Sequence, residues 1–149
     1  MKFSEMPYER PDLEAVKARL SDFTARLKGA DSYGEAKAVF LEKEETDRRV
    51  ETQATLAQVR NTIDTRDQFY DGEVNFWNAA IPELEEYEQA WKLAMLESPF
   101  RGEFEAEYGS LMFLNTEIAL KTFSPDIVPQ LQRENDFTQE YQKLIASAQ

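Results

Sequence analysis

The stretch FYDGEVNFWNAAIPELEEYEQAW, residues 69–91, carries the richest aromatic stripe of the chain. Its apolar side chains return at steps of about three and four, with one double step over Glu73, which is the spacing of a helix face. Thr65 and Gln68 have the spacing of a capping box and predict where this helix begins. Pro82 removes one backbone hydrogen bond, at a cost of about 3 kcal/mol. Because the pattern continues on both sides, we predict one helix that is kinked at Pro82. The stripe comprises Phe69, Phe76, Ala80, Leu84, Tyr87 and Trp91.

Two interpretations of these aromatic rings are open. One is a ligand-binding cage made by Phe76, Trp77 and Trp91. The other is a hydrophobic core, which aromatic stripes at helical period usually form because each ring removes a large apolar area from water. We expect core packing.

Two further helices are predicted before this one. The first covers about 11–28, and Gly29 behind it should supply a left-handed stop. The second begins at Ser32, which forms a capping box with Glu35, and it breaks near 63–64. The apolar residues of the first helix are Leu13, Val16, Leu20, Phe23 and Leu27, and those of the second are Val39, Phe40, Val50, Leu56, Val59 and Ile63.

The run EKEETDRRVE, residues 42–51, lies in the middle of the second helix. It places Glu44 opposite Arg48 and Glu45 opposite Arg49 at i,i+4, the favourable order for ion pairs. A metal-binding cluster is the alternative, but metal-binding carboxylates keep their charge for the metal. We therefore expect salt bridges here.

A catalytic bundle with paired carboxylates is a related hypothesis. The glutamates of the third helix fall around the helix and do not converge, so we expect a solvated face instead. These glutamates are Glu83, Glu85, Glu86 and Glu88.

Shorter elements follow the third helix. Ser98 and Pro99 form a cap-and-start pair for a helix over 100–108, which Gly109 should close. Residues 110–123 are apolar on a side broad enough to be nearly buried, so we expect a central helix of the core. The apolar side comprises Leu111, Leu114, Ile118 and either Leu120 or Phe123.

The last helix is predicted over 124–149. Ser124 and Pro125 pair a capping side chain with the residue that suits the first helical position, and Pro129 is tolerated so near the first turn. The end has no stop signal, and we expect fraying in its last residues, ASAQ. Its apolar side, which should dock within this chain or on another, comprises Ile127, Leu131, Phe137, Tyr141, Leu144 and Ile145.

No segment shows the sustained alternation of a strand, so we predict an all-α fold. Residues 1–149 should form a single helical domain, an antiparallel hairpin or bundle of about five or six helices with a long kinked third helix. The length suits one domain with its own core.

Composition excludes several kinds of function. The chain has no histidine, which excludes an HExxH zinc site and imidazole-based triads, and no cysteine, which excludes disulfides and thiolate metal sites. The formal charge of −12 repels nucleic acids and anionic membrane surfaces. No window approaches the length of a membrane span. We expect a soluble protein of a reducing cytoplasm.

Four segments together resemble the N-terminal region of oligoendopeptidase F, a bacterial relative of thimet oligopeptidase. The resemblance covers essentially the whole chain in order, with a departure at Asn78 and Ala79, where the family often has an acidic pair. The segments are FSEMPYERPDLE, RNTIDTRDQFYDGEVNFW, LESPFRGEFEAEYG and TFSPDIVPQLQRENDFTQEYQKLIASAQ.

The resemblance implies a helical wall over a deep channel that admits short peptides. In the family, zinc is bound by the two histidines of HExxH and a later glutamate, and members continue well past residue 149. The resemblance thus implies an N-terminal domain, inactive alone, of a longer zinc metallopeptidase. It implies no catalytic, cofactor-binding or metal-binding residue in this chain. Residues 124–149 would lead toward the missing C-terminal catalytic domain, and the chain alone should self-associate.

An alternative function is a self-standing acidic helical adaptor that binds a basic protein or peptide. It explains the charge and the lack of catalytic groups, but not the open C-terminal helix. Arg66, Tyr70 and Arg101 are candidates for substrate contact because they are polar and lie near turns. Salt bridging is the interpretation we favour for each.

Overall fold

The computed structural model describes residues 5–122 and 124–147. This part of the chain contains no strand, which confirms the predicted all-α class. Its helices are α1 (Leu13–Lys28), α2 (Tyr33–Ile63), α3 (Gln68–Glu97), α4 (Arg101–Tyr108), α5 (Leu111–Thr122) and α6 (Val128–Ser147), with the 3-10 turn η2 (Pro125–Ile127) before α6.

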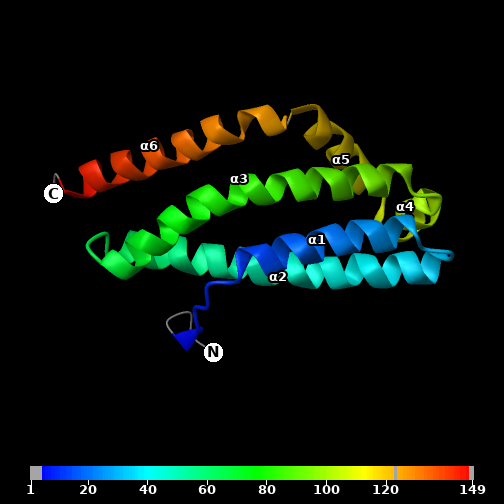
Figure 1. The fold of residues 1–149 in the computed structure, drawn as a ribbon, viewed down its shortest axis with the longest axis horizontal. Coiled ribbons are helices and arrows are strands. Elements are labelled where there is room, and N and C mark those ends of the chain that lie inside the picture. The colour runs from blue at the N-terminus through cyan, green and yellow to red at the C-terminus, as the bar shows by residue number, and fades with distance from the viewer. Residues whose placement is uncertain (1–4, 123, 148–149) are drawn as a thin grey trace.

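The first three helices pack side by side and enclose the core, and α2 runs antiparallel to α1 and α3 (Figure 1). α4 and α5 turn the chain at one end of this layer, and α6 returns along α3. Leu20, Phe23 and Leu27 of α1 are at most 3% exposed, so the predicted stripe of α1 faces the core. Burying such a side chain contributes about 1.5–3 kcal/mol. The main cluster also includes Ala36, Val39, Phe40, Leu84, Trp91, Ala94, Met95, Phe104 and Phe113.

The N-terminal ends of α1, α2 and α3 are capped by side chains. Asp12 accepts from the backbone amides of Glu14 and Ala15 and caps α1. At α2, the Ser32 hydroxyl accepts from the Glu35 amide at 3.3 Å, as predicted. The Glu35 carboxylate, however, accepts from the amide of residue 31, one residue earlier than a capping box requires.

α1 ends at Lys28, as predicted, but the predicted conformation of Gly29 and the predicted cap of α3 are wrong. Gly29 has φ −91°, so it is not left-handed; its amide donates to the Ala25 oxygen and closes α1 by ordinary right-handed turns. Thr65 does not cap α3. The carboxylate of Asp67 does, by accepting from the amides of Phe69 and Tyr70, because it directly precedes the first helical residue.

α3 is one continuous helix with Pro82 inside it, as predicted. The helix bends along its length (Figure 1), consistent with the backbone hydrogen bond that proline removes. Pro82 itself is buried, so packing on both sides of the kink offsets the lost hydrogen bond.

α4 is closed by Gly109, which has φ +88° and is the only residue with positive φ in the described part of the chain. This stop was predicted. The start of α4 differs slightly, because the Ser98 hydroxyl accepts from the Phe100 amide in the preceding turn and the helix begins at Arg101.

α5 is not the central core helix that its sequence predicts. Leu111 is 65% exposed, and Leu114 and Ile118 are each 52% exposed. Only Phe113 of this helix is fully buried, in contact with the core cluster. α5 packs against α3 and α4 on one side, with Met112 against the core cluster, so Leu111, Leu114 and Ile118 point away from the bundle. Leu120 is half-buried, and Phe123 lies outside the described residues.

α6 is attached to α3 through polar side chains. The Asn78 amide donates to Gln139 Oε1 at 2.9 Å, and the Gln139 amide donates to Asp71 Oδ1 at 3.0 Å. Lys143 forms an ion pair with Asp71 at 2.5 Å, and the Asn135 amide donates to the Asn78 carbonyl at 3.2 Å. Asn78 therefore lies in the interface between α3 and α6.

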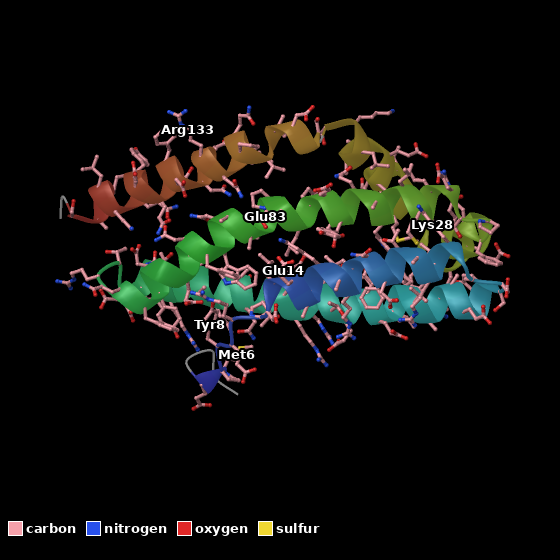
Figure 2. The ribbon with its side chains drawn as sticks, viewed as in Figure 1. Met6, Tyr8, Glu14, Lys28, Glu83 and Arg133 are labelled. Atoms are coloured by element: carbon pink, nitrogen blue, oxygen red, sulfur yellow. The ribbon has the colours of Figure 1, made fainter. Side chains whose placement is uncertain are left out.

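The apolar side of α6 is largely exposed. Phe137, Tyr141 and Leu144 are 56%, 64% and 67% exposed, and Ile145 is 48% exposed. Figure 2 shows Arg133 on the outer side of this helix, away from α3. The expected docking of this side within the chain does not occur among the described residues. The last two residues of the predicted fraying segment lie outside the described part.

Candidate functional site

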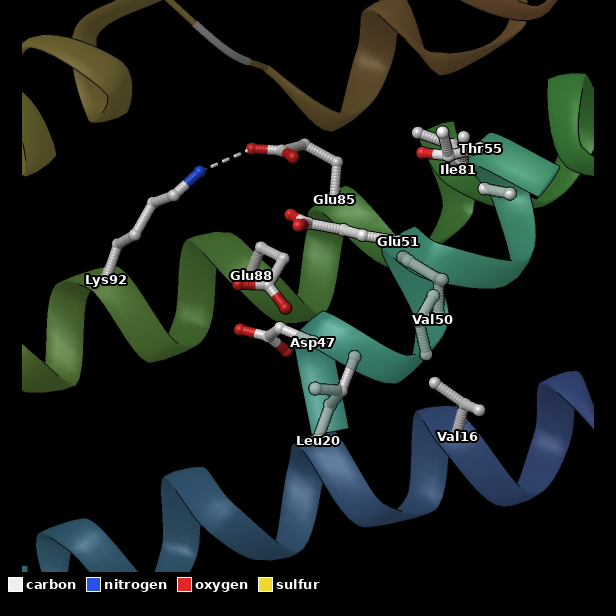
Figure 3. Close-up of a pocket in the computed structure, with 12 residues that line it drawn as sticks. Val16, Leu20, Asp47, Val50, Glu51, Thr55, Ile81, Glu85, Glu88 and Lys92 are labelled. Atoms are coloured by element: carbon white, nitrogen blue, oxygen red, sulfur yellow. Dashed lines mark hydrogen bonds and ion pairs between the residues drawn. The ribbon is translucent and has the colours of Figure 1, made fainter. Parts of the chain in front are cut away.

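A groove of about 610 Å³ lies between α2 and α3, with α1 beneath it (Figure 3). Its apolar lining combines buried and accessible side chains, since Leu20 and Leu84 are buried whereas Ile81 is 49% exposed. An accessible apolar surface in a hollow is a typical setting for binding. The apolar lining comprises Val16, Leu20, Val50, Ala54, Ile81 and Leu84.

Two carboxylates that line the groove, Asp47 and Glu88, share a buried ammonium group beside it. The Lys43 side chain is 3% exposed, and its Nζ donates to Asp47 Oδ2 at 2.5 Å and to Glu88 Oε2 at 2.7 Å. Burial by itself would lower the pKa of Lys43, but the carboxylates of Glu88 and Asp47 raise it above its ordinary value. Burial raises the pKa of Glu88, and Lys43 only partly opposes this shift.

The other glutamates of α3 have separate partners. Glu83 pairs with Lys17 of α1 at 2.7 Å, and Glu85 accepts from Lys92 at 2.7 Å. Glu86 is exposed. Glu83, Glu85 and Glu88 thus each pair with a different lysine and are half-buried. This side of α3 is therefore less exposed to solvent than the sequence predicted.

A second polar cluster anchors the segment before α1. Glu73 is 5% exposed and accepts from Arg10 Nε at 2.9 Å, from Arg10 Nη2 at 2.5 Å and from the Tyr8 hydroxyl. The Tyr8 oxygen in turn accepts from the Trp77 indole at 3.1 Å, and Arg10 lies over the Phe76 ring at 4.5 Å. Figure 2 shows Met6 and Tyr8 on the segment that leads into α1.

These contacts shift the pKa values of Glu73, Tyr8 and Arg10, and hydrogen bonding to Glu73 raises that of Arg10. Hydrogen bonding to Arg10 lowers the pKa of Glu73, against the opposing effect of burial. Burial and the hydrogen bond to Glu73 raise the pKa of Tyr8 to about 12. The carboxylate therefore stays ionised and the phenol stays a donor over the neutral pH range. The cluster holds residues 8–10 against α3 and presents no free acid or base, so we assign it a structural role.

The aromatic residues do not form a cage. Trp77 and Trp91 are 3% and 6% exposed and belong to different core clusters. Phe76 contacts only Trp77 of these two, with ring centroids 5.2 Å apart. Core packing, the expected alternative, is confirmed for Trp77 and Trp91. Phe69, which begins the predicted stripe, is instead 57% exposed in the first turn of α3, where its ring contacts Tyr8 and Tyr70.

The three polar candidates near turns bind other side chains of this chain. Arg66 lies 3.7 Å from Asp64, and the Tyr70 hydroxyl accepts from Arg60 at 2.7 Å. Arg101 contacts Glu105 at 2.7 Å and Glu117 at 3.0 Å. Arg66 and Tyr70 lie at the turn between α2 and α3, whereas Arg101 lies at the opposite end of α3 (Figure 1). The structure does not unite them in one site.

The ion pairs predicted in the middle of α2 are half confirmed. Arg49 Nε donates to Glu45 at 2.9 Å, as predicted. Arg48 also pairs with Glu45, one helical turn away at i,i+3, and not with Glu44. One carboxylate thus serves both arginines, and burial raises the pKa of Glu44.

The described residues do not fit a zinc ion. The chain has neither histidine nor cysteine, and no three acidic side chains in the described part converge so as to hold a metal. No described helix is long and apolar enough to cross a membrane.

The described residues thus form an all-α fold with a groove between α2 and α3. A family model, the Peptidase M3 N-terminal domain, matches residues 3–123. The chain therefore belongs to the Peptidase M3 N-terminal domain family, which confirms the resemblance seen in the sequence.

Solved structures agree with this assignment. A protein described as an oligoendopeptidase F is 39% identical with a TM-score of 0.96, over 99% of this chain and 26% of that one. PZ peptidase A, solved with an inhibitor, is 38% identical with a TM-score of 0.94, over 98% of this chain and 26% of that one. An oligoendopeptidase F of Bacillus anthracis strain Ames is 33% identical with a TM-score of 0.91, over 95% and 26% of the two chains. No curated protein matches. The chain spans about a quarter of the length of these solved relatives.

Proposed function

We propose that this chain is the N-terminal domain of a longer metallopeptidase that hydrolyses short peptides. The observation that carries the proposal is the family match over residues 3–123, together with relatives that are named as peptidases and are about four times longer. In this proposal the chain contributes an enclosing wall and binding surface, and the catalytic groups belong to the rest of the peptidase. The adaptor alternative gains no support from the comparisons.

The exposed apolar side chains of α5 and α6 support a covering partner. Large exposed apolar patches mark interaction surfaces. Several such residues are about half or more exposed on two helices that follow each other in the chain. We propose that the catalytic domain covers them in the longer protein, and that they drive self-association of the chain alone. The residues are Leu111, Leu114, Ile118, Phe137, Tyr141, Leu144 and Ile145.

Zinc would be bound outside this chain. The chain lacks histidine and cysteine, the nitrogen and sulfur ligands of zinc sites, so it supplies neither. The chain alone is proposed to be inactive for the same reason. The lack of cysteine also suits a reducing cytoplasm, where we propose that the peptidase acts.

A chimera tests the proposal. This chain replaces the matching N-terminal quarter of the oligoendopeptidase F that is 39% identical to it. We expect the chimera to cleave a quenched fluorescent peptide of about ten residues, to leave folded proteins intact and to lose activity with 1,10-phenanthroline. The catalytic part without any N-terminal domain and the 149-residue chain alone are the controls. A folded, zinc-loaded chimera without peptide cleavage would contradict the proposal, as would activity that scales with the chain alone.

A further inference from the structure

The groove between α2 and α3 carries more negative than positive charge. Its carboxylates lie close together above the apolar lining (Figure 3). Lys43 and Lys92 are the lysines that pair with them. Four carboxylates thus face two ammonium groups, which leaves a net negative charge of two, and Glu51 is the carboxylate without an ion-pair partner in the described part of the chain. The carboxylates are Asp47, Glu51, Glu85 and Glu88.

Glu51 is the accessible member of this set. Its side chain is exposed, and its carboxylate forms no hydrogen bond or ion pair with another residue in the described part of the chain. Glu85, by contrast, already accepts from Lys92 and from Gln89, each at 2.7 Å. A cationic ligand can therefore reach Glu51 without displacing a native contact.

The surroundings of Glu51 select the kind of cation. The neighbouring Val50 and Ala54 are half-buried, and Ile81 across the groove is half-exposed, so an aliphatic stem gains apolar contact there. Lysine and arginine side chains combine such a stem with a charged head. A metal ion is a poorer fit, because no three acidic side chains of the described residues converge.

The dimensions suit a short peptide. The lining of α3 extends from Ile81 to Lys92, which at 1.5 Å per residue is about 16 Å along the helix. An extended chain of about five residues covers that length. Glu51 lies on α2, opposite this stretch of α3, so a side chain near the centre of such a peptide reaches it.

We propose that this groove binds a short peptide with a central lysine or arginine, whose stem lies on Val50 and Ile81 and whose charged head pairs with Glu51. The choice of a peptide as ligand rests on the proposed function. Binding itself needs only this chain, so it is measured without any catalytic domain. The groove would give the peptidase a preference for basic peptides.

The experiment uses the 149-residue chain and two labelled probes. They are the amidated, fluorescein-labelled pentapeptide leucine-alanine-lysine-alanine-leucine and its analogue with glutamine in place of lysine. Fluorescence anisotropy at low salt measures the dissociation constants. One exposed ion pair contributes up to about 1 kcal/mol to the binding free energy, which corresponds to about a fivefold change in affinity. We expect the lysine probe to bind about fivefold more tightly than the glutamine probe.

Two matched variants separate the groove from the general acidity of the surface. Glu51→Gln should weaken binding of the lysine probe about fivefold. Glu86→Gln makes the same charge change on α3 at an exposed residue that does not line the groove, and should leave binding unchanged. Circular dichroism checks that both variants keep the helical content of the parent chain.

Three results would overturn the proposal. These are equal binding of the two probes, equal weakening by both variants, and no binding of either probe to a folded chain. Each of them leaves the chimera test of peptidase function untouched. Conversely, an inactive chimera combined with lysine-selective binding to this groove would refute the proposed function and keep the binding site.

Discussion

Glu73→Ala should be strongly destabilising, and the structure permits an estimate. The carboxylate is 5% exposed and accepts three hydrogen bonds, two of them from Arg10. Removing one partner of a buried ion pair costs about 3–5 kcal/mol. The Arg10 side chain is 48% exposed and regains water when Glu73 is lost, so the lower end, about 3 kcal/mol, applies. In a chain of this size, that lowers the melting temperature by about 6–12 °C.

Urea unfolding at pH 7, followed by circular dichroism, measures this cost. Glu86→Ala on the same helix is the control, and as an exposed substitution it should change the unfolding free energy by less than about 0.5 kcal/mol. A double-mutant cycle with Arg10→Ala then isolates the pair. A cost for Glu73→Ala no larger than that of the control would refute the buried-pair reasoning.

The pH dependence gives a second check on Glu73. Its pKa is lowered in the folded state, chiefly by hydrogen bonding to Arg10. A lowered folded pKa contributes stability that is present above the unfolded value of about 4.3 and is lost as the pH falls through the folded pKa. The stability difference between the parent chain and Glu73→Gln should therefore narrow below about pH 4. A difference that stays constant down to pH 2 would contradict the assigned shift.

The remaining predictions concern two glycines, the buried Lys43 beside the groove and the exposed apolar side of α6. Gly109→Ala should cost about 1–3 kcal/mol of stability because the backbone there has φ +88° and ψ 154°. Gly72→Ala should instead stabilise the chain by about 0.5–1 kcal/mol, because Gly72 lies within α3 and an added Cβ meets no atom within 4 Å. Thermal unfolding of the two variants compares these effects. Lys43→Met removes the counter-charge of Glu88, whose pKa is already raised by burial. The loss of stability in this variant should be largest at neutral pH and should shrink as the pH falls and Glu88 becomes protonated. Urea unfolding between pH 7 and pH 4 measures this loss. Phe137→Glu should reduce self-association in sedimentation velocity with no loss of helicity, and unchanged association would exclude this side of α6 as the contact.

The helices themselves were largely predictable from the sequence. Apolar residues at helical spacing, and glycine at the end of α4, act over a few neighbouring residues and are visible in any local window. The errors at helix ends were also local. Asp67 caps α3 in place of Thr65 because its carboxylate stands directly before the first helical residue, and several polar residues near that turn could have served.

Glu73 shows what the local pattern misses. In the sequence it interrupts the apolar stripe of α3, yet in the structure it lies on the same buried face. It is tolerated there because Arg10, 63 residues earlier, neutralises it. The ion pair between Lys43 and Glu88 beside the groove was equally hidden in the sequence. The two residues are 45 positions apart, so no helical period implies that they pair. The signal that could have found Glu73 was its position in the stripe.

The sequence by itself determined the all-α class, the order of the helices, the kink at Pro82 and the family, because each depends on residues close together in the chain or on ordered motifs. The tertiary structure decided which faces are buried. α6 has an apolar side as marked as that of α1, and α5 is more apolar than α1 on average, but Leu114 and Leu144 remain exposed whereas Leu20 does not. Amphipathicity specifies that a helix face needs a partner, and only the packing of distant segments specifies whether this chain supplies one.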